Sequence, residues 1–504
     1  MFRRDHAPET NGKGEYFPMT APTKHYRAPS ITFAAAAIVL TCAAYVGGRF
    51  LGDEHEHDAP AGNVPRMRLA QAGHLSVPAS RVASVRAKTP EAEKRLRAAA
   101  NTFSQVHELA RNEYVDALPS EQAMSYGAIR AMLSALEDEQ SYFVTAPERQ
   151  LFDAESVGVF EGIGAVTAIR AAKTKAGFNE LRLLVVAPLP DSPAALAGLQ
   201  TGDRITHVDG FYILGDTPYL TPSKLVRPSP MPSPTNVSPG DEEPPIHSGI
   251  GLLVAQMRLR QGGKGSHQLI VQRHGVAKPL RIAVRFSQTV APRLVVRREK
   301  SSGRAAVYFR VGAFTEKSVE ELSSVLQNTP SGVCVVLDLR QNAGTGSLKV
   351  AERICARLTV SAEPFAIEIG SGGRRTPLPL PTAELAKEKR PLSVLTDRGT
   401  AGFAEALASR LADSGATVVA AERTWGDGRS QTLYPLPDGS AFTLTTGRLI
   451  SPKGKGWDQV GIAPRVLLPS GLDEADTVAR AVAVAGRWAG ANVATSVPAR
   501  EAIR

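Results

Sequence analysis

The chain has 504 residues, of which 43% are hydrophobic and 21% charged, with a formal net charge of +10. This globular composition excludes whole-chain disorder, collagen and a coiled-coil rod, and the length predicts about three domains. Three cysteines exclude a disulfide scaffold, and the scattered basic residues argue against nucleic acid as a partner. The last histidine is His274, so the C-terminal half holds no Ser-His-Asp triad and no histidine-ligated metal, and we expect no cofactor.

An uncharged apolar run of 21 residues, Ala28–Gly48, lies near the N-terminus. As a helix it spans roughly 30 Å, the thickness of a bilayer's hydrocarbon core. Basic residues predominate before it and acidic residues follow it, which predicts a cytoplasmic tail at 1–27 and a single-pass anchor at 28–48 in the cytoplasmic (inner) membrane. The bulk of the chain is then periplasmic or otherwise extracytoplasmic. A cleaved signal peptide and a buried core helix are the alternatives.

Two stretches lack a sustained apolar period. Residues 53–90 are interpreted as a linker, and the cluster His55-Glu56-His57-Asp58 within it as an exposed acidic stretch, with a loose metal site as the alternative. Residues 211–249 hold nine prolines, which favours polyproline II or an irregular conformation. Because strand-like sequence flanks this second stretch on both sides, we interpret it as an insertion inside a domain.

The remaining chain divides by its periodicity into a mixed α/β and β protein. Apolar residues at spacings of three and four predict a small helical lobe at 91–150. Short β-like runs with two helical segments predict a partly open barrel at 155–288. From 289 to 470 strands alternate with helices, and the apolar run Val333–Leu339 is typical of a buried parallel strand. A helical tail is expected at 471–504.

A glycine-rich segment carries the first resemblance to a known family. Phe160-Glu161-Gly162-Ile163-Gly164, followed by Pro190–Ala194 and Ala197–Ile205, resembles the PDZ domains of bacterial proteases. The resemblance implies that the amides of Gly162, Ile163 and Gly164 receive the terminal carboxylate of a peptide, which adds as a strand to the domain's edge. Protein or peptide C-termini are therefore the expected partners. The alternative is a glycine-rich turn that binds no ligand.

The α/β region carries a second resemblance. The segments 338–344, 422–426, 434–440 and 444–448, in this order, are similar to the carboxyl-terminal processing, or tail-specific, serine peptidases, and the likeness extends over roughly residues 95–470. It implies a split peptidase-like α/β core next to the PDZ domain. It also implies a serine nucleophile and a lysine base 25 residues apart.

Neither catalytic group is present at the matching positions. Thr400–Glu405 aligns with the segment of the nucleophile and places Gly402 there, while Trp425–Gly428 places Asp427 at the base, 25 residues later. Glycine has no side chain to attack a carbonyl, and a carboxylate replaces the neutral amine that the mechanism needs. The resemblance further implies that Gln431 is a retained site residue. It assigns oxyanion-binding amides to Gly344 and Phe403.

These observations predict a membrane-anchored, exported homologue of this family that binds C-termini and is catalytically inactive, with a regulatory or scaffolding role. An active serine-type endopeptidase with displaced groups is the alternative, and Thr400, Ser430, Lys453 and Lys455 are its candidates. A purely structural envelope protein is the third hypothesis. Two other residues, Cys334 and Cys355, are interpreted as buried thiols, with a disulfide between them as the alternative.

Overall fold

The computed structural model describes residues 68–69, 74–76, 89–156, 158–173, 179–214, 247–260, 265–290, 294–301 and 303–487. All of them belong to the larger of two units, Arg66–Arg504. The predicted tail at 1–27, the anchor at 28–48, the histidine-containing cluster at 55–58 and most of the insertion lie outside these ranges. Within the ranges, no helix combines the length and apolar character that crossing a membrane requires.

The helices expected for the N-terminal lobe are present: α3 (Pro90–Glu113), α4 (Glu121–Ser134) and α5 (Ala146–Ser156). The hydroxyl of Thr89 accepts a hydrogen bond from the amide of Ala92 at 3.2 Å, and Ser120 caps α4 in the same way. Such N-caps satisfy amides that have no partner within the helix. The short strand β3 (Phe143–Val144) then pairs with a strand of the C-terminal half and joins the lobe to it.

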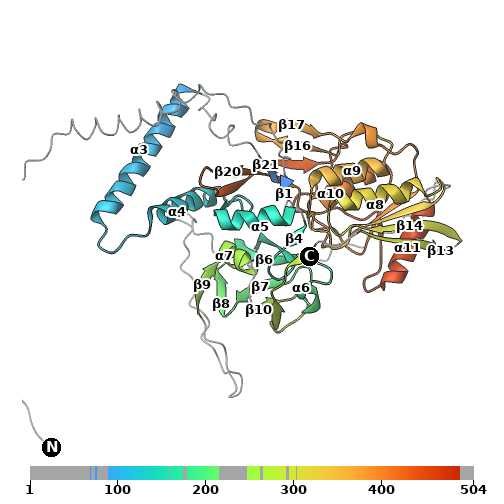
Figure 1. The fold of residues 1–504 in the computed structure, drawn as a ribbon, viewed down its shortest axis with the longest axis horizontal. Helices are drawn as coiled ribbons and strands as arrows, with labels where there is room; N and C mark the ends of the chain where they lie inside the picture. The colour runs from blue at the N-terminus through green and yellow to red at the C-terminus, as the bar shows by residue number, and fades with distance from the viewer. Residues whose placement is uncertain are drawn as a thin grey trace, which may run out of the picture. The chain divides into compact units, whose positions relative to one another are not determined.

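The barrel region forms a sheet in the order β11-β10-β7-β6-β5. Its elements are β5 (Ala165–Lys173), β6 (Asn179–Pro188), α6 (Pro193–Leu196), β7 (Arg204–Val208), β8 (Phe211–Leu214), β9 (His247–Gly251), α7 (Leu252–Arg260), β10 (Ser266–Gln272) and β11 (Leu280–Arg285). Strand β5 lies at the edge, and α7 contacts it (Figure 1). Strands β4 (Val159–Phe160) and β12 (Thr289–Val290) pair beside this sheet.

The ends of the predicted irregular stretch are ordered, which corrects its boundaries. Phe211–Leu214 and His247–Gly251 pair as parallel strands, and β8 also pairs with β7. The physical reason is burial, because Ile213 is only 5% exposed and joins the core of this domain. The insertion therefore begins after Leu214.

The C-terminal region contains a six-stranded sheet in the order β13-β14-β15-β18-β19-β22. Its strands are β13 (Val295–Ser301), β14 (Arg304–Arg310), β15 (Cys334–Asp338), β18 (Leu392–Leu395), β19 (Thr417–Ala420) and β22 (Val466–Leu467), all parallel except β13. Helices α8 (Glu316–Gln327), α9 (Leu348–Leu358) and α10 (Phe403–Asp413) cover one face, and α11 (Glu474–Arg487) covers the other (Figure 1).

Alternation along the strands explains these two layers. Val307 and Phe309 join the apolar cluster with α8, α9 and α10, whereas Ala306 and Tyr308 join the cluster with α11. Successive side chains of a strand point to opposite faces, so a central strand covered on both sides is apolar throughout. Although the sequence sets 471–504 apart as a tail, the helix within it packs against the sheet.

A seven-stranded sheet completes this half, in the order β1-β2-β20-β21-β16-β17 with β3 paired to β21. Its strands are β1 (Arg68–Leu69), β2 (His74–Ser76), β16 (Ala366–Gly370), β17 (Arg375–Leu378), β20 (Arg429–Pro435) and β21 (Ala441–Ile450), and short 3-10 turns occur at Ser371–Gly373 and Thr382–Glu384. Strand β20 begins at Arg429, two residues after the predicted base position 427. The site is therefore at the start of this strand.

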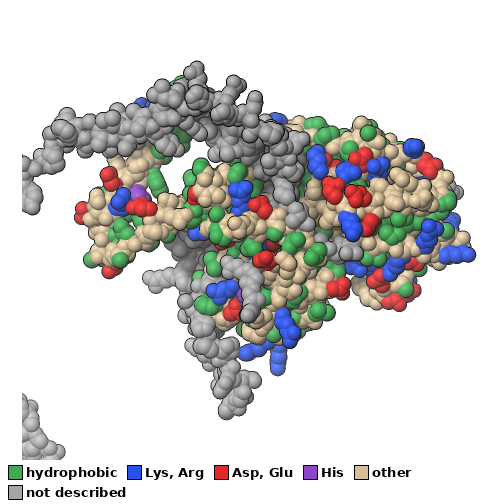
Figure 2. Space-filling model, viewed as in Figure 1, with side chains coloured by type: hydrophobic (Ala, Val, Ile, Leu, Met, Phe, Trp, Pro, Cys, Tyr) green, Lys and Arg blue, Asp and Glu red, His purple; other side chains and the backbone are tan. Residues whose placement is uncertain are grey.

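Acidic and basic side chains are mixed over α8 and α9 (Figure 2), where Arg353 pairs with Glu316 and Glu384.

Cys334 and Cys355 are both buried and free, so the alternative of a disulfide between them is wrong. Burial raises the pKa of Cys355 to about 12, which keeps this thiol protonated and inert.

Candidate functional site

The structure brings the two predicted catalytic positions together. Gly402 immediately precedes α10 with φ +53° and ψ −120°, a backbone conformation that favours glycine. A Cβ atom built on it would lie 3.8 Å from Oδ2 of Asp427 and 3.6 Å from the carbonyl oxygen of Ala343. A side chain at 402 would therefore point toward residue 427, as a nucleophile points toward its base.

Asp427 lies on the loop that leads into β20 and is partly buried. Its Oδ1 accepts a hydrogen bond from Nε2 of Gln140 at 3.2 Å, and its backbone carbonyl accepts one from the indole of Trp457 at 3.2 Å. Burial raises the pKa of the Asp427 carboxyl above its ordinary value, and the charge of Arg429 partly opposes this shift. The position thus carries a desolvated acid in place of an amine.

A fully buried carboxylate, Glu405, fastens the start of α10 to this loop. Its Oε2 accepts hydrogen bonds from the amides of Gly402 at 3.2 Å and Asp427 at 2.7 Å. Its Oε1 accepts from the amide of Gly426 at 2.7 Å and from the hydroxyl of Thr424. Burial nevertheless raises the pKa of Glu405 to about 8. In the sequence, Glu405 served only to align the nucleophile segment. In the structure, its hydrogen bonds hold the start of α10 against the loop at 426–427.

The two predicted oxyanion donors differ in their availability. The amide of Gly344 donates to Oδ1 of Asn342 at 2.9 Å and is thereby occupied. The amide of Phe403, in the first turn of α10, finds no acceptor among the residues that the structure describes. Gly344 itself is required by close packing, because a Cβ on it would lie 2.6 Å from the nitrogen of Phe403. One of the two amides therefore remains for a ligand oxygen.

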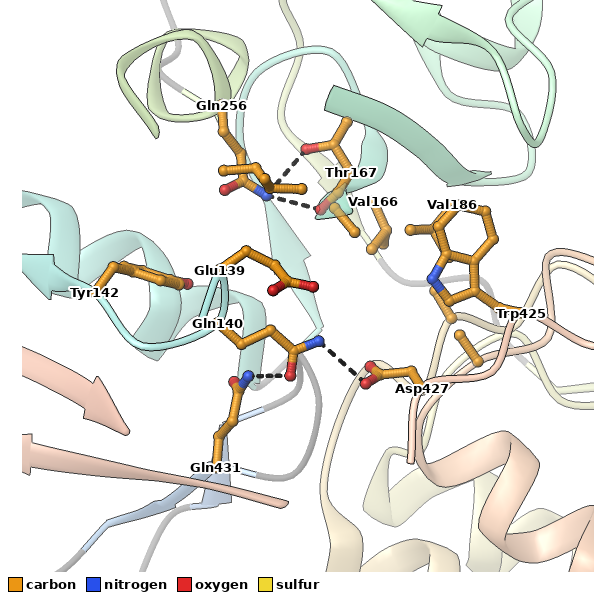
Figure 3. Close-up of a pocket in the computed structure, with 14 residues that line it drawn as sticks. Glu139, Gln140, Tyr142, Val166, Thr167, Val186, Gln256, Trp425, Asp427 and Gln431 are labelled. Carbon is orange, nitrogen blue, oxygen red and sulfur yellow. Dashed lines mark hydrogen bonds between the residues drawn. The ribbon is translucent and has the colours of Figure 1, made fainter. Parts of the chain in front are cut away.

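The retained glutamine lies in the same site. Gln431 on β20 is buried, and its Nε2 donates to Oε1 of Gln140. The Nε2 of Gln140 in turn donates to Oδ1 of Asp427 (Figure 3). Gln140 belongs to the end of the helical lobe, 287 residues before Asp427. No periodicity or motif in the sequence around Gln140 indicates a site residue, so Gln140 was not among the predicted ones.

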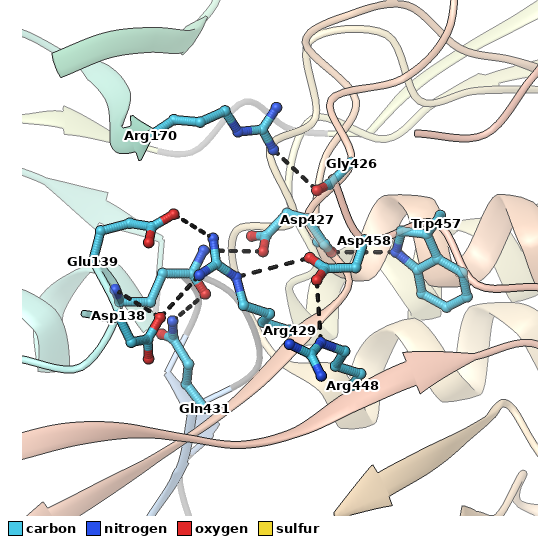
Figure 4. Close-up of polar contacts among 12 residues, drawn as sticks. Asp138, Glu139, Arg170, Gly426, Asp427, Arg429, Gln431, Arg448, Trp457 and Asp458 are labelled. Atoms are coloured by element: carbon cyan, nitrogen blue, oxygen red, sulfur yellow. Dashed lines mark hydrogen bonds and ion pairs between the residues drawn. The ribbon is translucent and has the colours of Figure 1, made fainter. Parts of the chain in front are cut away.

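Arg429 ties the lobe to the core beside this site (Figure 4). It pairs with Asp138 at 2.9 Å and Glu139 at 2.7 Å on the lobe, and approaches Asp458 at 3.8 Å. Arg448 approaches Asp458 from the solvent side at 3.4 Å. The network pairs two guanidinium groups with three carboxylates and leaves Asp427 outside its ion pairs.

The edge strand of the PDZ-like sheet also contacts the loop of position 427. Arg170 on β5 donates to the carbonyls of Trp425 at 2.8 Å and Gly426 at 3.0 Å. Its guanidinium also stacks on the indole of Trp425, 4.6 Å from the ring centre. Arg170 is a second residue that analysis of the sequence missed, because the contact joins positions 255 residues apart.

The predicted carboxylate-binding loop is closed by α7. The amide of Ile163 donates to the carbonyl of Leu259 at 3.1 Å, and the Ile163 side chain lies in the domain core. A Cβ on Gly162 would lie 2.1 Å from that same carbonyl, and Gly162 and Gly164 are both buried. The amide of Ile163 is thus occupied in this structure, and the binding of a carboxylate by the three amides stays a prediction.

The displaced groups proposed as alternative catalysts do not converge. Thr400 is buried and donates to the carbonyl of Leu339 at 2.9 Å. Lys453 donates to the carbonyl of Asp413 at 2.6 Å, and Lys455 lies 4.0 Å from its carboxylate. Asp413 ends α10, about 16 Å from the start of that helix. Both amines therefore lie at the opposite end of the helix from position 402, where Lys453 is hydrogen-bonded and Lys455 is exposed.

Ser430, the other candidate nucleophile, is buried on β20.

Across the residues that the structure describes, no group of three or more histidine, cysteine, aspartate or glutamate side chains is arranged to hold a metal ion. The site thus combines a glycine, a desolvated carboxylate and one remaining amide.

Comparison with known families agrees with this architecture. Residues 306–468 match the family described as Peptidase family S41. Residues 184–220 match the PDZ domain. The first match covers the parallel sheet and the site, and the second covers β6 to β8.

Curated relatives and a solved structure give the same result. The chain is 26% identical over 385 residues to the Carboxy-terminal processing protease CtpB of Bacillus subtilis (strain 168), covering 75% of this chain and 70% of the relative. It is 27% identical over 380 residues to the Carboxy-terminal-processing protease of Bartonella bacilliformis, covering 74% and 75%. The fold is similar to that of a photosystem II D1 C-terminal processing protease, with a TM-score of 0.53, 20% identity and coverage of 76% and 91%. The chain therefore contains a peptidase family S41 domain and a PDZ domain, and it is similar to carboxy-terminal processing proteases over about three quarters of its length.

Proposed function

We propose that this protein binds the C-terminal ends of polypeptides and does not cleave them by serine–lysine catalysis. The observation that carries this proposal is the pairing of Gly402 with Asp427. A side chain at 402 would face residue 427 at 3.8 Å, yet neither position carries the group that covalent catalysis needs. Glycine supplies no hydroxyl, and a carboxylate supplies no neutral amine next to it.

The surroundings of the pair support the same function. Asn342 occupies one of the two amides that would stabilise an oxyanion, and removing a single such donor costs about 2.7–4 kcal/mol of transition-state stabilisation in serine proteases. The rival groups Thr400, Lys453 and Lys455 are held by other partners. These three groups therefore give no support to a displaced catalytic pair.

Recognition of C-termini is supported by the PDZ domain and by the names of the relatives, which process carboxy-termini. Strand β5 lies at the sheet edge next to α7, the arrangement in which an extended peptide adds as a further strand. Because Leu259 occupies the amide of Ile163, binding requires α7 to move away from the loop at 162–164.

We place the protein at the cytoplasmic membrane as part of this proposal, with the folded part outside the cytoplasm. The apolar run 28–48 and the charges on its two sides support this placement. A regulatory or scaffolding role follows, since a binding protein at the membrane can hold a client without consuming it.

A proteolysis assay tests the absence of cleavage. The full chain in detergent is incubated with an unstructured protein substrate, beside the double variant Gly402→Ser with Asp427→Lys and the single variant Gly402→Ser. We expect no cleavage by the wild type, and a fluorophosphonate probe should label none of its residues. Cleavage by the double variant alone would show that the rest of the site is intact.

Cleavage by the wild-type protein would contradict the proposal. The variants Thr400→Ala and Ser430→Ala would then locate the nucleophile, and activity that survives both changes would mean that residue 402 is wrongly aligned.

A further inference from the structure

A small cavity lies where the lobe, the PDZ domain and the core meet. Its volume is about 60 Å³. We call it the central cavity and define it by the residues that line it: Glu139, Gln140, Tyr142, Val166, Thr167, Ala168, Ile169, Val186, Gln256, Ala343, Ala401, Trp425, Asp427 and Gln431. One water needs at least 10–15 Å³ of such space, so the cavity takes about four non-hydrogen atoms, which is too few for a peptide but enough for the end of a side chain.

The polar wall of the central cavity is acidic. Figure 3 shows the side chains of Glu139, Gln140 and Asp427 directed at the same space. Within the described ranges, no cationic nitrogen lies within 4.0 Å of the Asp427 carboxylate, and Gln140 is its one side-chain hydrogen-bond donor. Oδ2 of Asp427 faces the space that the missing side chain of Gly402 leaves open. Partial burial destabilises a carboxylate that has no partner cation, and a bound cation offsets this cost.

The nearby cations neutralise this wall only in part: Arg429 pairs with Glu139, and the charges of Arg429 and Arg170 act on Asp427 without forming an ion pair with it. Arg429 uses its guanidinium on Asp138 and Glu139, and Arg448 lies beside Asp458. Arg170 donates hydrogen bonds to backbone carbonyls of the neighbouring loop. One carboxylate of the cluster, that of Asp427, thus has no guanidinium of its own.

Part of the lining of the central cavity is apolar. It is formed by Val166, Ile169, Val186, Ala343, Ala401 and the indole of Trp425. An apolar wall facing a carboxylate suits a ligand with a methylene chain and a charged end. A phosphate or carboxylate ligand would meet the charges of Glu139 and Asp427. A calcium ion needs six to eight oxygen ligands, usually with several carboxylates, and the part of the chain that the structure describes has no group of three or more acidic, histidine or cysteine side chains arranged for a metal.

We infer that the central cavity binds an alkylammonium group, carried either by a lysine side chain of the bound polypeptide or by a free amine. The ammonium pairs with Asp427 and donates further hydrogen bonds to the amide oxygens and Glu139, while the methylene chain lies along Val166 and Trp425. The lysine source rests on the proposed function, because it requires a polypeptide across the core. The assignment gives the carboxylate at position 427 a role in selecting lysine-containing clients.

The first experiment measures the binding of n-propylammonium chloride to the full chain by calorimetry and by the shift in thermal midpoint. The neutral n-propanol, of nearly the same size, is the control ligand. We expect the ammonium to bind and the alcohol not to bind. The variant Asp427→Asn should weaken ammonium binding at least tenfold, and Glu474→Gln, which changes an exposed carboxylate on α11, should leave it unchanged. Equal effects of the two ligands on wild-type protein would overturn the inference, and this comparison does not depend on the folding of any variant.

The second experiment distinguishes the two sources of the ammonium. Unstructured peptides with an apolar C-terminus and one internal lysine are compared with their Nε-acetyllysine twins. Tenfold weaker binding of the acetylated twin to wild type, and equal binding of both to Asp427→Asn, would assign the cavity to a client's lysine. Peptide binding that ignores acetylation, together with no binding of n-propylammonium, would overturn the inference and leave the proposed function standing. Binding of n-propylammonium with no peptide binding would support a free amine and contradict the proposed function.

Discussion

The side-chain amide of Gln256 on α7 donates to the backbone carbonyl of Thr167 on β5 at 2.8 Å, and both residues are buried. Thr167 lies on the edge strand that a bound peptide would extend, so Gln256 occupies one of the acceptors that the peptide needs. Together with the bond from Ile163 to Leu259, this contact closes the groove between α7 and β5.

Gln256→Ala should therefore tighten peptide binding. Removing a hydrogen bond of about 1 kcal/mol that competes with the peptide raises affinity about fivefold. Fluorescence anisotropy with a labelled peptide ending in apolar residues measures the change. Its C-terminally amidated twin should bind neither protein, because it lacks the carboxylate that the loop at 162–164 would receive. Gln268→Ala, on the exposed part of β10, is the matched control. Unchanged affinity in Gln256→Ala would show that the side chain does not close the groove, and equal binding of acid and amide would reject carboxylate recognition.

Gly402 and Gly346 should respond differently to substitution by alanine. A Cβ on Gly402 meets nothing closer than 3.6 Å, so only its φ of +53° opposes alanine, at a cost of about 1–3 kcal/mol. A Cβ on Gly346 would lie 2.3 Å from the carbonyl oxygen of Phe314, which requires the backbone to shift. Thermal unfolding should show a midpoint a few degrees lower for Gly402→Ala and a much larger loss, or no folding, for Gly346→Ala. Equal losses would contradict the open space that the structure gives position 402.

Glu405 should make stability fall with rising pH. Its pKa of about 8 in the folded protein exceeds its ordinary value of 4.5, so between these values the folded state holds a proton that the unfolded state has released. Its contribution to the free energy of unfolding then decreases as pH rises from about 4.5 to 8, by at most about 1.4 kcal/mol per pH unit. Glu405→Gln, which resembles the protonated acid, removes this dependence. Denaturant titrations at several pH values should therefore show the wild type losing stability relative to Glu405→Gln as pH rises, and a constant difference would mean that the carboxyl is ionised throughout.

Arg429→Met should destabilise the protein far more than Arg448→Met. The side chain of Arg429 is only 9% exposed, and its removal leaves Asp138 and Glu139 without their partner, at a cost of about 3–5 kcal/mol. The side chain of Arg448 is 72% exposed, where an ion pair contributes about 0–1 kcal/mol. Chemical denaturation of both variants measures the difference. Similar small losses would show that the lobe is held to the core by other contacts.

The charges around 28–48 predict the orientation of the chain in the membrane. A reporter enzyme that is active only outside the cytoplasm, fused after Arg504, should be active, and the same reporter fused after residue 27 should be silent. The opposite pattern would contradict the proposed topology.

Several features follow from local sequence pattern alone. The run Val333–Leu339 predicted a buried parallel strand, and β15 (Cys334–Asp338) is buried at every residue, because a strand covered on both faces must be apolar throughout. The pairing of Gly402 with Asp427 followed instead from the resemblance to the tail-specific peptidases, whose two catalytic positions are also 25 residues apart. The buried strand follows from the residue types within one short run, and positions 402 and 427 follow from the order of motifs in a known family.

Only the tertiary structure decided which other residues complete the site. Gln140, Arg170 and Gln256 reach partners that lie 287, 255 and 89 positions away, and the sequence around each shows no period or motif that names its partner. The same holds for the amide of Ile163, which the glycine-rich segment offers to a ligand but α7 occupies. A hydrogen bond depends on distances within a few tenths of an ångström between segments brought together by packing, and such distances are set by the whole fold rather than by any local run of residues.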